Sequence, residues 1–113
     1  MPFIRTTTNC SVSKSTADKI TAACGQAIPL LRGKTEDWLM VEVTGEKHLY
    51  FKGSDAPCAI AEVQIYGKGN PAELDNLTDA LTKILSVSLN VPSDRIYVRY
   101  EEVAYWGWNG SNF

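Results

Sequence analysis

The first two residues, Met1 and Pro2, are the part of this sequence whose chemistry is most suggestive. Initiator methionines are usually removed when the next residue is small, and proline qualifies. Removal of Met1 gives Pro2 a free secondary amine in place of an amide nitrogen. An α-amino group has an unperturbed pKa of about 8, which apolar burial or a nearby cation lowers. The amine is therefore a candidate general base at neutral pH. The alternative is that Pro2 simply begins a strand, where no donor to the ladder is needed.

Other reactive side chains form no recognisable arrangement. His48 is the only histidine, and neither a Ser/His/Asp set nor a cluster with metal-ligand spacing accompanies it. Cys10, Cys24 and Cys58 are odd in number and widely spaced, which favours reduced thiols over a disulfide framework. No glycine-rich phosphate loop is present.

The composition is that of an ordinary globular protein and excludes several partners. The 113 residues fit a single domain over 1–113, with 44% hydrophobic and 21% charged residues. A net charge of −2 gives no attraction to nucleic acid or to an anionic membrane. Neither a signal peptide nor an apolar run of about 18 residues is present, so we expect a cytoplasmic protein without a membrane partner.

Hydrophobic periodicity predicts the elements that must position such a base. Apolar residues at helical spacing predict helices over 13–33 and 70–90, the first capped by Ser13 or Ser15 and kinked or shortened by Pro29. Asn109-Gly110 predicts a turn in the tail. Strands are predicted over 3–8, 38–43, 59–66 and 95–103, with a short one at 48–51.

These elements form two β-α-β units, at about 3–43 and 60–100. One shift of 57 residues superimposes them and pairs Asp37 with Asp94. Two such units side by side predict an α/β fold with a four-stranded mixed sheet and both helices on one face.

Strand alternation divides the sheet residues between two faces. The face under the helices is apolar: Ile4, Leu39, Val41, Val43, Ala61, Val63, Ile65, Ile96 and Val98. The opposite face is mixed: Phe3, Arg5, Trp38, Met40, Glu42, Glu62, Gln64, Tyr66, Tyr97 and Arg99. Because sheets with parallel pairs are usually covered on both sides, we infer a homo-oligomer whose other subunits shield the mixed face.

Several short motifs follow one another in a specific order: Met1-Pro2-Phe3, Gly33-Lys34, Gly53-Ser54, Pro57-Cys58-Ala59, Gly67, residues 92–97 and residues 107–113. In this order and spacing they resemble the macrophage migration inhibitory factor family of the tautomerase superfamily, over essentially the whole chain. The resemblance implies a homotrimer with three active sites at subunit boundaries, each with an N-terminal proline base. It also implies keto–enol tautomerisation of aromatic 2-keto acids, such as phenylpyruvate, and of dopachrome-type compounds, without a cofactor.

That chemistry fits the candidate base. Moving a proton between an α-carbon and a carbonyl oxygen needs a base whose pKa lies near the operating pH. It also needs hydrogen-bond donors where the enolate oxygen develops charge, and a cation for the carboxylate.

The family pattern assigns roles to three further residues. It places Lys34 beside the proline, to hold the substrate carboxylate or oxyanion and to depress the pKa of the amine; otherwise Lys34 is a cation favoured by a helix C-terminus. Tyr66 takes the position whose backbone N–H contacts substrate. Tyr97 matches a site residue contributed by the neighbouring subunit, or else is an aromatic that packs across the sheet.

Arg99 departs from the asparagine that many family members carry, although the D-dopachrome tautomerase branch has arginine. Arg99 either contacts substrate or forms an interface ion pair with Glu42 or Glu62. Aromatic residues are candidates for a pocket rim, Trp38, Trp106 and Phe113 foremost, with Phe3 and Trp108.

The family also leaves a second reading of function open. The alternative to an enzyme is a cytokine-like ligand, secreted without a signal peptide, that binds a cell-surface receptor while its tautomerase activity is vestigial. A third reading is a trimeric scaffold with an incidental pocket. The redox Cys-x-x-Cys motif of some relatives is incomplete, because Ala61 follows Cys58 where the second cysteine would stand.

Overall fold

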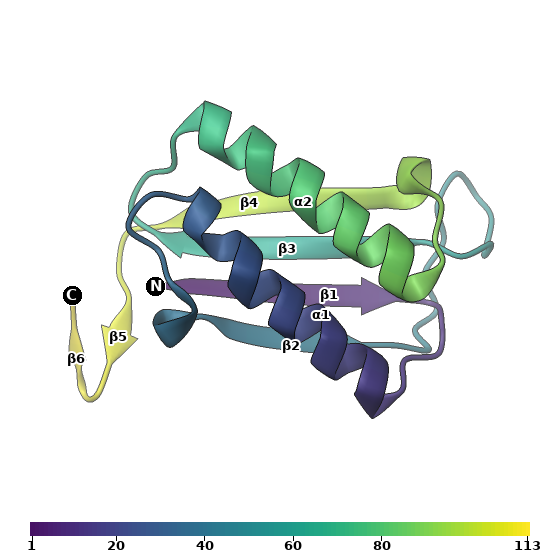
Figure 1. The fold of residues 1–113 in the computed structure, drawn as a ribbon, viewed down its shortest axis with the longest axis horizontal. Coiled ribbons are helices and arrows are strands. Elements are labelled where there is room, and N and C mark those ends of the chain that lie inside the picture. The colour runs from purple at the N-terminus through teal and green to yellow at the C-terminus, as the bar shows by residue number, and fades with distance from the viewer.

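A four-stranded mixed sheet carries two helices on one face (Figure 1). The computed structural model describes residues 1–113. The strands are β1 (Pro2–Thr8), β2 (Met40–Thr44), β3 (Ala59–Tyr66) and β4 (Ile96–Val103), in the spatial order β2-β1-β3-β4. β1 pairs parallel to β2 and antiparallel to β3, and β3 pairs parallel to β4. The predicted fold class, with two β-α-β units and both helices on one face, is confirmed.

The helices begin and end where the sequence provides capping residues. α1 (Lys14–Ala27) starts after Ser13, whose hydroxyl accepts a hydrogen bond from the Thr16 N–H at 3.1 Å. α2 (Pro71–Leu89) starts after Asn70, whose side chain accepts two backbone N–H groups of the first turn. Pro29 lies in the short 3-10 helix η1 (Ile28–Leu30) that follows α1, so the predicted shortening of the first helix is confirmed. Neither helix is both long and apolar enough to pass through a lipid bilayer.

The core lies between the sheet and the helices, on the face that strand alternation predicts. Ile4, Val63 and Ile65 are fully buried from the sheet side. The helices meet them with Ile20 from α1 and with Leu77, Leu81 and Leu85 from α2. Each such side chain contributes roughly 1.5–3 kcal/mol by leaving water. This apolar layer therefore holds the two helices against the sheet.

Two predicted strands differ from the structure. Residues 36–38 form the 3-10 helix η2 (Glu36–Trp38), closed by hydrogen bonds from Trp38 N–H to Thr35 O and from Leu39 N–H to Glu36 O. The strand therefore starts at Met40, and the prediction is wrong for its first two residues. No strand forms at 48–51, where Phe51 makes only an isolated bridge to Ser54.

The connection over residues 45–58 is instead held by side chains of the sheet ends. The Asn9 amide makes four hydrogen bonds to it, accepting one from the Cys58 N–H and donating to the carbonyls of Leu49, Asp55 and Ala56. The Arg95 guanidinium donates to four carbonyls, those of Phe51, Ser54, Ala56 and Pro57. Directional bonds to backbone carbonyls thus replace the missing ladder.

The tail forms a hairpin of β5 (Gly107–Trp108) and β6 (Ser111–Asn112). Its two turn residues, Asn109 and Gly110, have φ of 51° and 90°, as a tight two-residue hairpin turn requires. The predicted turn is confirmed. The hairpin lies beyond the sheet, at the end where the N-terminus is found (Figure 1).

Candidate functional site

A cavity of about 480 Å³ opens at the N-terminus. It is lined by the start of β1, the turn before β2, β3 and the tail: Met1, Pro2, Phe3, Asp37, Trp38, Leu39, Met40, Gln64, Trp106, Gly107 and Trp108. These segments meet because β1 and β2 start at the same edge of the sheet, where antiparallel β3 ends. Figure 1 shows the N-terminus and the C-terminal hairpin at this end.

Pro2 is held rigidly in this cavity. Its side chain is fully buried, and the residue pairs with Ile65 in the antiparallel ladder of β1 and β3. One residue earlier, the Met1 carbonyl accepts a hydrogen bond from the Tyr66 N–H at 3.1 Å. The chain therefore enters the sheet with both of its first residues fixed, and the backbone donor of Tyr66 points at Met1.

The electrostatics at the N-terminus favour a neutral amine. Burial lowers the pKa of the Met1 amino group from its ordinary value of 8.0, and the positive charge of Lys34 lowers it further. Lys34 is thus close enough to the chain terminus for their charges to interact. It sits on the segment between η1 and η2, where its own N–H donates to Leu31 O at 3.0 Å.

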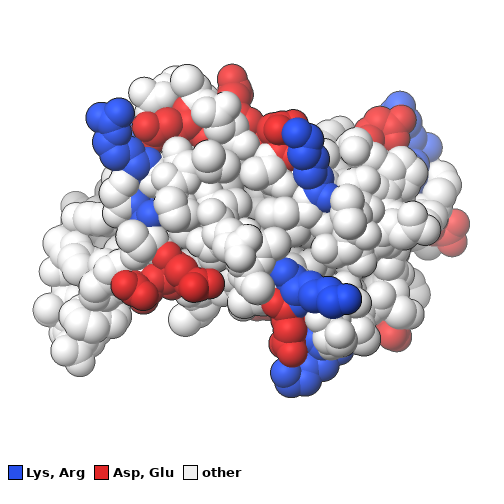
Figure 2. Space-filling model, in the orientation of Figure 1, with Lys and Arg blue, Asp and Glu red and all other residues white.

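Aromatic rings form the outer wall beside this amine. The rings of Trp38 and Trp108 meet edge-to-face with centroids 5.0 Å apart, and Phe113 stacks on Trp108 at 6.3 Å. Phe113 also lies 5.8 Å from the ring of Tyr66 and 6.4 Å from that of Trp38. Its N–H donates to Trp106 O at 3.0 Å, which closes the hairpin over the cavity. In Figure 2 no charged side chain lies over the part of the surface that this hairpin occupies.

Two candidate site residues lie away from the cavity within a single chain. Tyr97 pairs with Ile60 of β3, and Ile60 pairs with Thr7, near the opposite end of β1 from Pro2. Its ring makes an edge-to-face contact with Phe51 at 5.0 Å, and Tyr97 stays 60% exposed.

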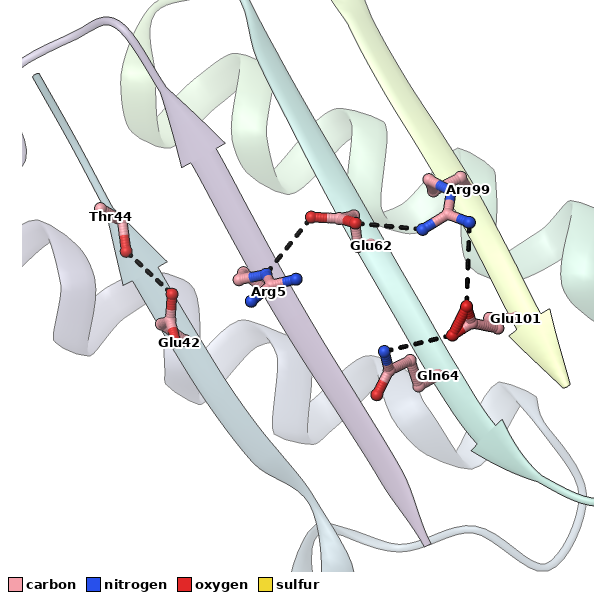
Figure 3. A network of polar contacts seen from close by, with 7 residues as sticks. All are labelled: Arg5, Glu42, Thr44, Glu62, Gln64, Arg99 and Glu101. Atoms are coloured by element: carbon pink, nitrogen blue, oxygen red, sulfur yellow. Dashed lines mark hydrogen bonds and ion pairs between the residues drawn. The ribbon is translucent and has the colours of Figure 1, made fainter. Parts of the chain in front are cut away.

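Arg99 lies halfway along the open face of the sheet, in the network drawn in Figure 3. Its Nη1 lies 3.0 Å from Glu62 Oε2 and its Nη2 lies 3.9 Å from Glu101 Oε2. Glu62 also accepts from Arg5 Nε at 3.3 Å, so one carboxylate on β3 bridges arginines on the two strands that flank it, β1 and β4. Glu42 accepts from Thr44 instead of an arginine. Within the chain, Arg99 is an ion-pair partner of Glu62.

The cavity also contains residues that were not among the sequence candidates. Met40 and Gln64 both pair with Phe3, on either side of β1, so their side chains share its face. The alternation pattern assigns all three to the mixed face, and the strand order would have placed them at Pro2. Asp37 carries no such signal, because it reaches the cavity through the 3-10 turn η2.

The arrangement defines an α/β protein with two β-α-β units and an aromatic cavity around a buried N-terminal proline. The family model described as "Macrophage migration inhibitory factor (MIF)" matches residues 1–113. The mouse macrophage migration inhibitory factor is 31% identical over 118 residues, which cover 100% of this chain and 99% of the mouse protein. The chain therefore belongs to the macrophage migration inhibitory factor family, as its motifs predict.

Solved structures agree with this assignment. The crystal structure of Leishmania major MIF2 superimposes with a TM-score of 0.94 at 31% identity, covering 100% of this chain and 97% of that one. The macrophage migration inhibitory factor homologue from Prochlorococcus marinus gives a TM-score of 0.89 at 25% identity, over 98% of each chain.

Proposed function

We propose that this chain is a cofactor-free keto–enol tautomerase of aromatic 2-keto acids such as phenylpyruvate, and of dopachrome-type compounds, with Pro2 as the general base. The observation that carries the proposal is the burial of Pro2 in an aromatic cavity beside Lys34. Membership of the family supports the same class of reaction.

Removal of Met1 transfers the chain terminus to Pro2 and makes its nitrogen basic. The two influences that lower the pKa of the Met1 amine, burial first and Lys34 second, also act on an amine one residue deeper in the fold. Pro2 is fully buried, so desolvation disfavours its ammonium form. More of this amine is therefore neutral at a given pH than in an exposed chain terminus, which favours a role as general base.

The same processing step frees a hydrogen-bond donor. The Tyr66 N–H is occupied by the Met1 carbonyl at 3.1 Å, and it loses this partner when Met1 leaves. A substrate oxygen that takes the place of the Met1 oxygen can accept this N–H. Rigid backbone donors are well suited to an enolate oxygen, since they need no reorganisation as charge develops.

The reaction is a proton transfer without net change in charge or oxidation state. The Pro2 nitrogen takes the proton from the carbon next to the keto group. The electron pair of the broken C–H bond forms the C=C bond of the enolate, and the π pair of the C=O bond moves to the oxygen. The enolate is stabilised by the Tyr66 N–H and by the cation Lys34, which also pairs with the substrate carboxylate. The prolinium then returns the proton to the oxygen, giving the enol. Trp38, Trp106 and Phe113 supply apolar contact for the aromatic ring of the substrate.

We further propose a homotrimer in which Tyr97 and Arg99 reach the site of a neighbouring subunit. One side of the sheet carries the helices, while the other carries the partly exposed side chains of Arg5, Glu62 and Arg99 and no covering element of its own. Covering this face with other copies would complete the second layer that sheets with parallel pairs usually have.

A phenylpyruvate tautomerase assay on protein lacking Met1 tests the proposal. Pro2→Gly should lower kcat/KM by about 10²-fold or more, the usual contribution of a positioned general base. Pro92→Gly is a matched control, because Pro92 lies outside the cavity lining. Equal activity of Pro2→Gly and the parent protein would contradict the mechanism. A folded parent protein without activity would favour the receptor-binding alternative.

A further inference from the structure

The segment that carries Lys34 is fastened to the two helices at two separate points. It runs from Leu31 to Trp38, between η1 and β2, and passes the start of α2 at the end of the molecule where the N-terminus lies (Figure 1). Gly33 within it has a φ of 82°, so the backbone reverses immediately before Lys34. A long lysine side chain on such a connection depends on the backbone for its placement.

The first fastening is a carboxylate of α2. Glu73 Oε1 accepts a hydrogen bond from the Arg32 N–H at 3.1 Å. Glu73 is the third residue after the capping residue Asn70, a position whose carboxylate commonly reaches back to the N-terminus of its own helix. Here it bonds across to another segment, 41 residues away in the sequence.

The second fastening is the contact of Glu36 with α1. The Glu36 carboxylate lies against the backbone of Gly25, in a space that any Cβ at residue 25 would fill. Lys34 lies between the two fastened residues, and Trp38 follows them into the cavity wall.

We propose that Glu73 is a positioning residue that holds Lys34 beside the N-terminal cavity, acting through the Arg32 backbone. The backbone bond carries this role, and the Arg32 side chain does not. The Arg32 guanidinium lies 3.9 Å from Glu73 and its side chain is 92% exposed, so solvent screens that ion pair.

The inference rests on the proposed function for its link to catalysis, but binding can test it without catalysis. Glu73→Asp keeps the charge in the first helical turn and shortens the reach to Arg32. Glu73→Gln keeps the reach and an acceptor oxygen but removes the charge. Arg32→Ala keeps the backbone N–H and removes only the exposed side chain.

The two Glu73 variants should rank in opposite orders for thermal stability and for ligand binding. An acidic residue in the first turn stabilises a helix, so Glu73→Asp should unfold at a higher temperature than Glu73→Gln. Binding of 3-phenylpropionate, an aromatic carboxylate that cannot tautomerise, should weaken about threefold to tenfold in Glu73→Asp, as expected for one lost hydrogen bond. Glu73→Gln and Arg32→Ala should bind within about twofold of the parent protein. In the phenylpyruvate assay, Glu73→Asp should raise KM by the same factor and also lower kcat, because Lys34 is proposed to stabilise the enolate.

A double-mutant cycle with Lys34→Ala separates this role from a general structural one. Once Lys34 is gone, Glu73→Asp should weaken binding less than about twofold further. Unchanged binding in Glu73→Asp, equal losses in Glu73→Asp and Glu73→Gln, or an undiminished effect without Lys34 would overturn the proposal. A parent protein that binds 3-phenylpropionate but turns over no phenylpyruvate would contradict the proposed function, while the binding cycle still decides the role of Glu73.

Discussion

The two ends of the sheet are held together by different kinds of contact. At the end where β1 begins, aromatic rings and apolar side chains surround a cavity, with Trp38, Trp108 and Phe113 in mutual contact. At the other end, Asn9 and Arg95 make eight hydrogen bonds to the connection over residues 45–58. Aromatic and apolar contacts thus dominate the first end, and directional bonds to backbone carbonyls dominate the second.

The difference shows how one small domain can divide its tasks. Hydrogen bonds to carbonyls fix a loop that has no ladder of its own, and the Phe51 ring in that loop contacts Tyr97 and the Arg95 guanidinium. Ring contacts around Pro2 leave the amine and the Tyr66 N–H without competing side-chain partners. We call the end with the cavity the open end and the end held by Asn9 and Arg95 the fixed end. The proposed trimer would bring the fixed end of one subunit, with Tyr97, to the open end of another.

Of the changes considered, retention of Met1 should have the largest effect, because it should abolish catalysis at the open end. An amide nitrogen has no basic lone pair, and the Met1 carbonyl continues to occupy the Tyr66 N–H. We expect a loss of about 10²–10⁴ in kcat/KM with an unchanged unfolding temperature. Intact-mass measurement and an assay on the same preparation check this, and full activity from protein that verifiably carries Met1 would rule out the mechanism.

Arg99→Ala distinguishes substrate contact from subunit contact. If Arg99 reaches a neighbour's site, KM for carboxylate substrates should rise by roughly tenfold to a hundredfold, the effect of losing one charge-assisted hydrogen bond of roughly 1.5–3 kcal/mol, while the trimer persists. If the Glu62 pair of Figure 3 maintains the interface, the trimer should weaken instead. Sedimentation at micromolar concentration and steady-state kinetics measure both. A monomeric parent protein would defeat the assembly proposal, and an unchanged KM with an intact trimer would remove both roles.

Asn9→Ala should destabilise the connection over residues 45–58 at the fixed end and leave the cavity at the open end unchanged. The substitution removes four hydrogen bonds to the 45–58 connection, two of them in partly buried surroundings. We expect the free energy of unfolding to fall by about 1–3 kcal/mol. Asn76→Ala, on the exposed side of α2, should change it by less than about 0.5 kcal/mol. Chemical denaturation measures both variants, and equal stabilities would show that the Asn9 bonds are not what holds the connection.

Periodicity predicts the parts of this fold that bury a regular face, and fails where local hydrogen bonds decide. Strand β3 (Ala59–Tyr66) is predicted residue for residue, because its inward side chains are buried at every second position. At Trp38 the pattern still alternates, but the 3-10 turn η2 takes the backbone out of the sheet. At 48–51 the apolar residues predict a strand, but hydrogen bonds from the Asn9 and Arg95 side chains to backbone carbonyls hold the segment as a loop.

The candidate site shows the same limit. Pro2, Trp38 and Trp106 meet in one cavity, with Lys34, Tyr66 and Phe113 adjoining it. The motifs contain Pro2, Lys34 and Phe113, and the resemblance to the family adds Trp38, Tyr66 and Trp106. Asp37 enters the cavity through η2, which no periodicity signals. Tyr97 and Arg99 lie elsewhere on the sheet, and one chain alone does not hold the contacts that would bring them to a neighbour's cavity.

The smallest expected effect is a change in pH dependence when Lys34 is removed from the open end. The neutral Pro2 amine is the active form, and we expect its pKa to be lowered by the two causes that lower the pKa of the Met1 amine, burial first and Lys34 second. kcat/KM should therefore rise with pH through this pKa and level off above it. Lys34→Ala removes the second cause and leaves the first, so the pKa should rise but stay below 8.0. Folding stability should also rise with pH. A base whose pKa is lowered in the folded state contributes fully to stability above its unfolded pKa, and loses that contribution as the pH falls through its folded pKa.

An NMR titration of the proline ring protons measures the pKa directly, with Lys14→Ala as control, because Lys14 is exposed and pairs with Asp18 on α1. A parent amine that titrates at or above 8.0, or a Lys34→Ala amine that titrates unchanged, would remove the electrostatic part of the proposal and leave Lys34 only its role as a partner of the carboxylate.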